Sequence, residues 1–208
     1  MTFSEYRYLL LSDLYRYRRS ISLRKLAYQV LFGEGGKYSF WFRTCTLLRS
    51  HKVLKFTLYP FAWLMLRRTM YRLGISIHPG TLMGPGFYIG HFGGIVVSAR
   101  SQIGRNCNIS QGVTIGKAHG GKHAGYPVIG DNVYIGPGAK IVGGITIGSN
   151  VAIGANCVVT KDTPDNAVVV GVPGEVISMG GSADQVNHTD YDRLLVRHQQ
   201  HITKVRSG

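Results

Sequence analysis

The chain has 208 residues, of which 44% are hydrophobic, and carries a formal net charge of +14. This composition is ordinary for a soluble globular protein, and the length alone leaves the number of domains open. The basic excess lies in residues 1–74, which hold 14 Lys and Arg against 3 Asp and Glu. Such a field attracts nucleic acid, anionic lipid or a polyanionic substrate. No nucleic-acid-binding motif is present, so nucleic acid is not an expected partner.

Cysteine usage and hydropathy predict where the protein resides. Cys45, Cys107 and Cys157 are odd in number and widely spaced, which argues against a disulfide framework and a zinc knuckle and favours a reducing cytoplasm. The charged N-terminus lacks the features of a signal peptide. The most apolar segment, residues 57–66, is about half the roughly 20 residues that cross a bilayer. A cytoplasmic location is therefore expected.

Residues 1–74 read as a basic helical region. Apolar residues after Ser22 follow the i, i+3, i+4, i+7 spacing of a helix that stops at Gly33-Glu34-Gly35-Gly36. Further helices are expected over residues 3–17, 38–50 and 53–73, the last bent or interrupted at Pro60 and closed by Gly74. The region is predicted to form a helix hairpin or a small bundle.

From Ile77 onward the pattern changes to a period of six. A period of six fits neither a helix nor a single strand; it is typical of hexapeptide repeats, in which three short strands and three turns close one triangular coil. The sequence therefore predicts a mainly β fold, a left-handed parallel β-helix over residues 75–178, preceded by the α-helical region. The repeated aliphatic residues, just over four coils, are Ile77, Met83, Ile89, Val97, Ile103, Ile109, Ile115, Ile129, Ile135, Ile141, Ile147, Ile153 and Val159.

The repeat is interrupted twice, and interruptions of a regular solenoid usually mark functional loops. The first inserts two residues around His91, and the second extrudes a loop that contains His119, His123 and Tyr126. Residues 179–208 form a polar, His-rich tail, in which a weak helix over residues 190–205 is conceivable. We assign no chemistry to this tail.

Two motifs resemble the serine acetyltransferase branch of the hexapeptide acyltransferases: residues 89–97, Ile-Gly-His-Phe-Gly-Gly-Ile-Val-Val, and residues 110–116, Ser-Gln-Gly-Val-Thr-Ile-Gly. The resemblance covers residues 75–178 and implies an acetyltransferase in which His91 is the general base. Histidine suits this role because its ordinary pKa of about 6.5 leaves it neutral and basic near pH 7. The competing interpretation is a histidine that only stabilises a turn.

The resemblance also implies the acetyl donor, acetyl-coenzyme A, and no metal cofactor. Pro137 and Ala155, one coil apart, are expected to line the path of pantetheine, with Thr160 and Lys161 near its far end. Lysine is a natural partner for a phosphate; the alternative for Lys161 is a solvated charge at the end of a coil. Members of this family form homotrimers with the donor between neighbouring subunits, so a trimer is expected.

Departures from the family pattern bear on the acceptor. Serine acetyltransferases have acidic residues where this chain has Ser76 and Gly90, an arginine at Gly125 and a histidine at Tyr126. Because those residues orient the base and hold the charged amino acid, their loss predicts a neutral acceptor, a sugar hydroxyl of a surface polysaccharide or its precursor. His119, His123 and Tyr126 are then candidate acceptor-binding residues.

Residues 12–17, Ser-Asp-Leu-Tyr-Arg-Tyr, also resemble the N-terminal segment of polysaccharide O-acetyltransferases of capsules and O-antigens. A carbohydrate acceptor assembled at the membrane would suit the basic, aromatic-rich helices of residues 1–74, which could make peripheral contact with the inner membrane surface. The alternative for these helices is a trimer contact surface with solvated charges.

Three other functions compete with glycan acetylation. One is serine O-acetylation in cysteine biosynthesis. Another is a zinc-dependent carbonic anhydrase of β-helical fold, which would need His91, His119 and His123 to converge around one metal ion. The last is a non-catalytic scaffold, disfavoured because the candidate base and the candidate coenzyme A motif occur together.

Overall fold

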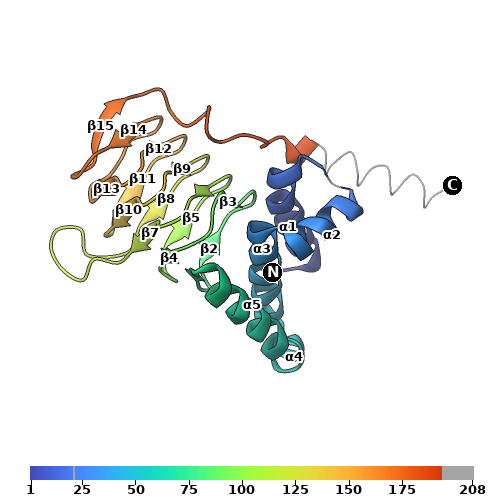
Figure 1. The fold of residues 1–208 in the computed structure, drawn as a ribbon. Helices are drawn as coiled ribbons and strands as arrows, with labels where there is room; N and C mark the ends of the chain where they lie inside the picture. Colours follow the sequence, from blue (N-terminus) through green and yellow to red (C-terminus); the bar gives the residue numbers. More distant parts are fainter. Residues whose placement is uncertain (21, 194–208) are drawn as a thin grey trace.

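The computed structural model describes residues 1–20 and 22–193 and places a helical region at one end of a stack of short strands (Figure 1). The helices come first along the chain and the strands follow from residue 75 onward. The helices are α1 (Phe3–Arg18), α2 (Leu23–Phe32), α3 (Glu34–Ser50), α4 (Lys52–Thr57) and α5 (Tyr59–Leu73).

The helical region differs from the sequence prediction at α3, which begins at Glu34 and runs through two glycines predicted as a stop. Gly33 ends α2 and also caps α3. The glycines are required by close packing, because a β-carbon on Gly35 would collide with the Tyr17 ring and one on Gly36 with Gln29. As predicted, the last segment is interrupted near Pro60, which occupies the first turn of α5, and closes at Gly74.

The strands form three sheets that together make a parallel β-helix, as predicted, with about five turns. Every pairing is parallel except that of β14 with the final strand, β15. The five-stranded sheet contains β1 (Ile75–Ile77), β4 (Ile95–Val97), β7 (Thr114–Gly116), β10 (Lys140–Val142) and β13 (Val158–Val159). The four-stranded sheet contains β2 (Leu82–Met83), β5 (Gln102–Ile103), β8 (Val128–Ile129) and β11 (Thr146–Ile147). The six-stranded sheet contains β3 (Tyr88–Ile89), β6 (Asn108–Ile109), β9 (Tyr134–Ile135), β12 (Ala152–Ile153), β14 (Val168–Val170) and β15 (Glu175–Ser178).

The period of six produces the core of this solenoid. All thirteen predicted aliphatic positions, from Ile77 to Val159, are buried, with at most 8% of the residue exposed. They belong to one continuous apolar cluster that also includes Tyr38, Phe42 and Leu66 of the helical region. Because burial of apolar surface is the main favourable contribution to folding, the helices and the solenoid stabilise each other.

Each coil turns at three corners, which stack into three columns. The His91 corner joins the six-stranded to the five-stranded sheet and contains residues 90–94, 110–112, 136–138 and 154–156. The loop corner joins the five-stranded to the four-stranded sheet and contains residues 98–101, 117–127, 143–145 and 160–163. The asparagine corner completes the triangle.

The asparagine corner is held by a ladder of side-chain amides. Asn106, Asn132, Asn150 and Asn166 all have left-handed backbones, with φ between 54° and 60°. Asparagine is among the few non-glycine residues that adopt this conformation readily. Each amide donates to the carbonyl oxygen of the next, over 2.8, 3.0 and 3.2 Å in order. The ladder fixes the stacking of successive coils.

Residues 179–193 of the tail return along the solenoid to the helices (Figure 1). The hydroxyl of Tyr191 donates to Asn106 at the end of the ladder, over 2.7 Å, and that of Tyr8 in α1 donates to Asp192, also over 2.7 Å. The tail therefore ties the solenoid to α1. Most of the conceivable helix over residues 190–205 lies outside the described residues.

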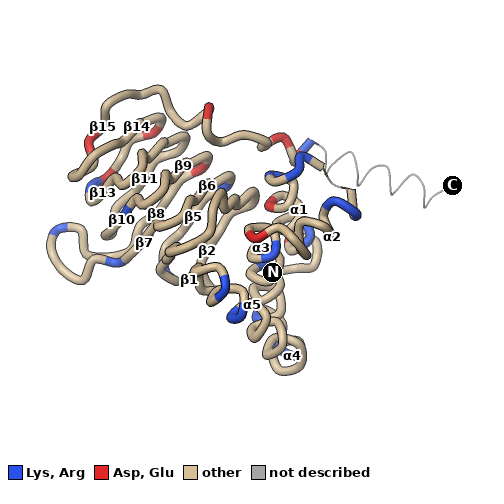
Figure 2. The backbone as a smooth tube through the Cα atoms, in the orientation of Figure 1, with Lys and Arg blue, Asp and Glu red and all other residues tan. Residues whose placement is uncertain are grey.

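Within the described residues, no helix is long and apolar enough to cross a membrane. Between Glu34 and Asp131 the sequence has no acidic residue. In Figure 2 basic residues lie on α5 and the extruded loop, whereas acidic residues recur along β9 to β15 and the tail. Large apolar side chains on α4 and α5, such as Phe56 and Phe61, are exposed. Peripheral membrane contact through residues 1–74 stays a prediction.

Candidate functional site

His91 and two of the candidate donor-binding residues lie in one column at the His91 corner. Their strands β3, β6, β9 and β12 pair in register, with Ile89, Ile109, Ile135 and Ile153 side by side. The turns after these strands therefore stack, which brings His91, Pro137 and Ala155 onto the same edge of the solenoid. His91 is exposed to solvent there. This edge of the solenoid therefore presents an accessible imidazole beside a row of stacked turns, along which an extended ligand can lie.

A column of positions without side chains runs beside these residues. Gly94, Gly112 and Gly138 stack on one another with φ of 64°, 73° and 73°. A β-carbon on Gly112 would lie 3.3 Å from the α-carbon of Gly138. Glycine is therefore required by both the backbone conformation and the close approach. The strip leaves the backbone open to a long flexible ligand such as pantetheine, so the corner fits the expected acetyl donor.

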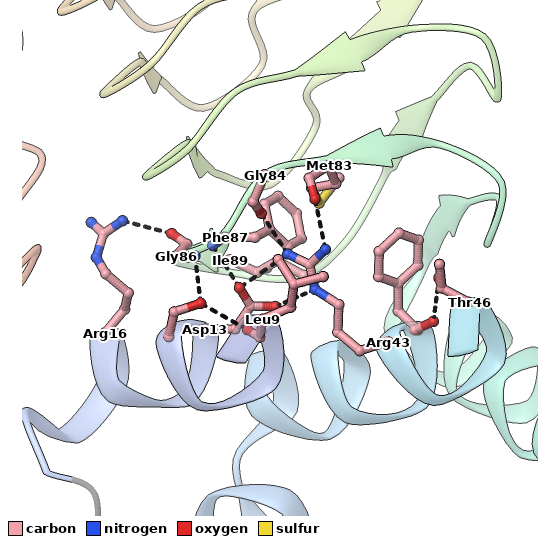
Figure 3. Close-up of polar contacts among 12 residues, drawn as sticks. Leu9, Asp13, Arg16, Arg43, Thr46, Met83, Gly84, Gly86, Phe87 and Ile89 are labelled. Carbon is pink, nitrogen blue, oxygen red and sulfur yellow. Dashed lines mark hydrogen bonds and ion pairs between the residues drawn. The ribbon is translucent and has the colours of Figure 1, made fainter. Parts of the chain in front are cut away.

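Helix α1 fastens the segment that leads into His91 (Figure 3). The amide N–H of Gly86 donates to Ser12 over 3.0 Å, and that of Ile89 donates to the Tyr17 hydroxyl over 3.0 Å. Arg16 donates to the carbonyl of Gly86 over 2.8 Å. The segment Ser-Asp-Leu-Tyr-Arg-Tyr, singled out in the sequence for its resemblance, thus positions the strand before His91.

A buried ion pair that the sequence analysis missed completes this support. Arg43 of α3 donates to both carboxylate oxygens of Asp13, over 2.8 and 3.1 Å, and the two side chains are 2% and 0% exposed. Arg43 also donates to the carbonyls of Met83 and Gly84, over 2.7 and 2.6 Å, while Asp13 accepts from the Phe87 amide over 2.9 Å. The sequence placed Asp13 and Arg43 in two predicted helices, residues 3–17 and 38–50, but nothing in it indicated that they pair.

The extruded loop does not meet His91 within one chain. The loop leaves the C-terminal end of β7 at the loop corner. His91 lies before the N-terminal end of β4, at the opposite end of the strands of the same sheet. Its carbonyl at His123 accepts from the Gly144 amide over 2.8 Å, so the loop folds over the next coil. Two cations lie near the ring of Tyr126, with Arg100 and Lys117 at 5.7 and 5.6 Å from its centroid. His119 is exposed and His123 is half-buried.

Thr160 and Lys161 also lie at the loop corner, directly after β13, and both are exposed. The Lys161 ammonium is 4.0 Å from the Glu175 carboxylate, and both side chains are about two-thirds exposed. Such a pair is weak in water, so Glu175 competes only slightly for a phosphate that approaches Lys161.

Lys140 is a second cation that the sequence analysis missed. It lies on the outer face of the five-stranded sheet, in the row of Ser76, Val96, Thr114 and Val158. Its ammonium donates to the carbonyl of Gly112 over 2.5 Å, at the His91 corner. The sequence could have indicated Lys140, because it occupies an outward-facing position of its hexapeptide in a row whose other residues are uncharged.

The cysteines do not supply a nucleophile. All three are buried, and burial raises the pKa of the Cys45 and Cys107 thiols to about 12. The reactive thiolate is therefore negligible near neutral pH. Among residues 1–20 and 22–193, no group of three or more His, Cys, Asp or Glu side chains is arranged to hold a metal. His91 is separated from His119 and His123, so the zinc alternative lacks its ligand set within one chain.

Comparisons with known proteins agree with this geometry. Residues 126–161 match the family model of the bacterial transferase hexapeptide (six repeats). A serine acetyltransferase of Staphylococcus xylosus is 36% identical over 190 residues, covering 86% of this chain and 84% of the relative. A crystal structure of the Brucella abortus serine acetyltransferase in complex with coenzyme A has a TM-score of 0.69 and 30% identity, over 85% of this chain and 69% of that one. The Neisseria gonorrhoeae enzyme in complex with serine has a TM-score of 0.66 and 28% identity, over 85% and 70%.

These relatives overturn the predicted polysaccharide acceptor. Proteins 36% and 39% identical to most of the chain are serine acetyltransferases, and the same name is carried by the structural neighbours. The prediction of a carbohydrate acceptor, and with it of capsule or O-antigen acetylation, is therefore wrong. It depended on four absent side chains and on the resemblance of residues 12–17 to polysaccharide O-acetyltransferases, and neither excludes serine as the acceptor.

Proposed function

The chain belongs to the serine acetyltransferase family of hexapeptide transferases, and we propose that it transfers the acetyl group of acetyl-coenzyme A to the hydroxyl of serine. The single observation that carries this proposal is the identity of 36% over 86% of the chain with an enzyme of that name. The exposed His91, at the head of a corner that fits the donor, supports it.

We assign the role of general base to His91. Its imidazole takes the proton of the serine hydroxyl as that oxygen attacks the thioester carbonyl. The new C–O bond forms, the C–S bond breaks, and the leaving sulfur recovers the proton from the imidazolium. The products are O-acetylserine and coenzyme A. Because α1 and Arg43 hold residues 83–89, His91 is presented from a fixed strand end, which is what proton transfer in a defined geometry requires.

Donor binding is proposed for the His91 corner, with Pro137 and Ala155 lining the path of pantetheine, and for Thr160 and Lys161 of the loop corner, near the far end of that path. A tryptophan at Ala155, an exposed position, should fill this path. We expect Ala155→Trp to raise KM for acetyl-coenzyme A by about tenfold or more, because a bulky ring displaces the ligand from the glycine strip. Steady-state kinetics with varied donor measure the effect.

The matched control is a tryptophan at Ala183, an exposed tail residue beside the asparagine corner. Ala183→Trp should leave KM for the donor unchanged. Equal effects of the two substitutions would argue against a donor path at the His91 corner.

A homotrimer is proposed because the candidate site is incomplete in one chain. His91 and the loop with His119, His123 and Tyr126 lie at opposite ends of the strands of one sheet. Only another copy can therefore bring that loop to His91. We expect light scattering after size-exclusion chromatography to give three times the chain mass of 22.9 kDa. A monomer with full activity would contradict the shared site.

The proposed activity is tested by incubating the purified protein with acetyl-coenzyme A and L-serine. Free coenzyme A is measured with a thiol reagent and O-acetylserine by mass spectrometry, and the two should form in equal amounts. N-acetylglucosamine serves as an acceptor control with hydroxyl groups but no amino acid charges. Turnover with the sugar that exceeds turnover with serine would contradict the proposal.

A further inference from the structure

Helix α4 and the first turn of α5 form a tip of the helical region, away from the stacked strands (Figure 1). No residue of the six-residue α4 is buried, and only the half-buried Leu54 packs against the apolar core. A helix this short is not stable in water by itself and depends on packing of its apolar face. In the described part of the chain, the side of α4 that carries Val53 and Phe56 has no such cover.

The exposed apolar side chains continue from α4 into α5. Val53 and Phe56, one turn apart, are 73% and 80% exposed, and Leu58 and Phe61 are also exposed. Single exposed apolar residues are normal on a protein surface, but a group of large ones marks an interaction site for a protein or a membrane. The tip patch consists of Lys52, Val53, Lys55, Phe56, Leu58 and Phe61.

The charge of the tip patch favours an anionic partner. Among the described residues, neither Lys52 nor Lys55 forms an ion pair within 4.0 Å. The Lys55 ammonium lies 5.9 Å from the centroid of the Phe56 ring, so cation and aromatic ring are presented together. The sequence has no acidic residue between Glu34 and Asp131. Large apolar side chains interleaved with lysine are typical of segments that lie in the interface of anionic membranes.

Symmetry and charge both favour a flat anionic surface over a second copy of the patch. Two tip patches in contact would bring Lys52 and Lys55 against their equivalents, and the patch holds no carboxylate to compensate. Cyclic symmetry places equivalent atoms in one plane, so the three patches of the proposed trimer can meet one bilayer together. Three weak contacts with one surface reinforce each other.

We propose that the tip patch docks the protein on a membrane surface that contains anionic lipid. Its four apolar side chains enter the interfacial layer, and its two lysines lie among the headgroups. The contact is peripheral, since no helix of the described residues is long and apolar enough to cross a membrane. The proposal narrows the membrane contact predicted for residues 1–74 to residues 52–61, and it does not depend on the identity of the acceptor.

Co-sedimentation of the full-length protein with lipid vesicles measures the contact. Vesicles of phosphatidylcholine with about 30% phosphatidylglycerol should bind the protein at least about tenfold more tightly than vesicles of phosphatidylcholine alone. Raising the salt from about 0.1 M to about 1 M should weaken binding, because it shortens the range of electrostatic attraction from about 10 Å to about 3 Å. Neither measurement needs acetyl-coenzyme A or serine.

Charge variants test whether the lysines of the tip patch act, rather than the net charge of the chain. Lys52→Gln with Lys55→Gln should weaken binding to the phosphatidylglycerol vesicles by about tenfold or more, since each basic residue at the surface contributes about 1 kcal/mol. Lys117→Gln with Lys122→Gln is the matched control, because it removes the same charge from exposed positions of the extruded loop. The control should bind within about twofold of wild type.

A second pair of variants tests insertion of the apolar side chains. Phe56→Ser should weaken vesicle binding by about tenfold, because burial of an aromatic side chain is lost. Ile177→Ser is the matched control, since Ile177 of β15 is 63% exposed and lies outside the tip patch. It should bind as wild type does. Each substituted side chain is exposed, so the melting temperatures should stay close to that of wild type.

Three outcomes would overturn the proposal. The first is equal weakening by the tip and loop lysine variants, which would indicate attraction by the overall charge. The second is unchanged vesicle binding of Phe56→Ser with a lower mass in light scattering, which would make the tip patch an interface between copies. The third is no binding of wild type to vesicles with phosphatidylglycerol. Serine acetylation, measured without lipid, would stand in each case.

Discussion

Replacing His91 with alanine should lower kcat for serine acetylation by about 10²- to 10⁴-fold, the usual contribution of a positioned general base. The KM values for serine and acetyl-coenzyme A should change little, because the imidazole acts on the hydroxyl proton during attack and holds neither substrate. His91 is exposed at its turn, so the substitution should cost little stability. Initial-rate kinetics and thermal melting measure the two effects.

Chemical rescue tests whether the lost group is a base. Since the site is open to solvent, added imidazole should restore part of the activity of His91→Ala, while wild type should not respond. A matched control is His119→Ala, at an exposed loop position: because His119 is a candidate acceptor contact and not the base, imidazole should not restore any activity lost in this variant. If His91→Ala retained full activity, another base or a non-catalytic role for this corner would have to replace the assignment.

The sequence predicted the solenoid well because its core is repetitive and local. One aliphatic side chain per six residues points inward, and each such position proved buried from Ile77 to Val159. The two interruptions were equally visible, since they shift the register of the repeat. What the repeat could not predict was the start of α3, because Gly35 and Gly36 break helices by propensity but are needed there by contacts with Tyr17 and Gln29.

The candidate site was predictable to the extent that it follows the repeat. The spacing of eighteen residues between Pro137 and Ala155 is one coil, and the structure places both in the column of His91. The buried pair of Asp13 and Arg43 was not predictable, because it depends on how α1 packs against α3. The acceptor was misassigned because the loss of four family side chains could be read from the sequence, but its effect on the choice of acceptor could not.

Removing one partner of the buried Asp13 and Arg43 pair should have the largest effect on stability. We expect Arg43→Ala to lower the free energy of unfolding by about 3–5 kcal/mol, because it leaves the fully buried Asp13 carboxylate without its countercharge. It also removes donors from the carbonyls of Met83 and Gly84. Chemical denaturation measures the loss. Arg7→Ala, at an exposed position of α1, should change stability by less than about 0.5 kcal/mol.

A double substitution separates the burial of charge from the support of His91. Asp13→Leu with Arg43→Met replaces the ion pair by apolar groups, which removes the unpaired charge and should recover much of the stability lost in Arg43→Ala. Activity should not recover in parallel, since neither new side chain bonds the Met83 carbonyl or the Phe87 amide that lead to His91. We therefore expect a stable protein with a lowered kcat. Equal recovery of stability and kcat would show that the pair supports the fold alone, and that α1 positions His91 through Ser12, Arg16 and Tyr17.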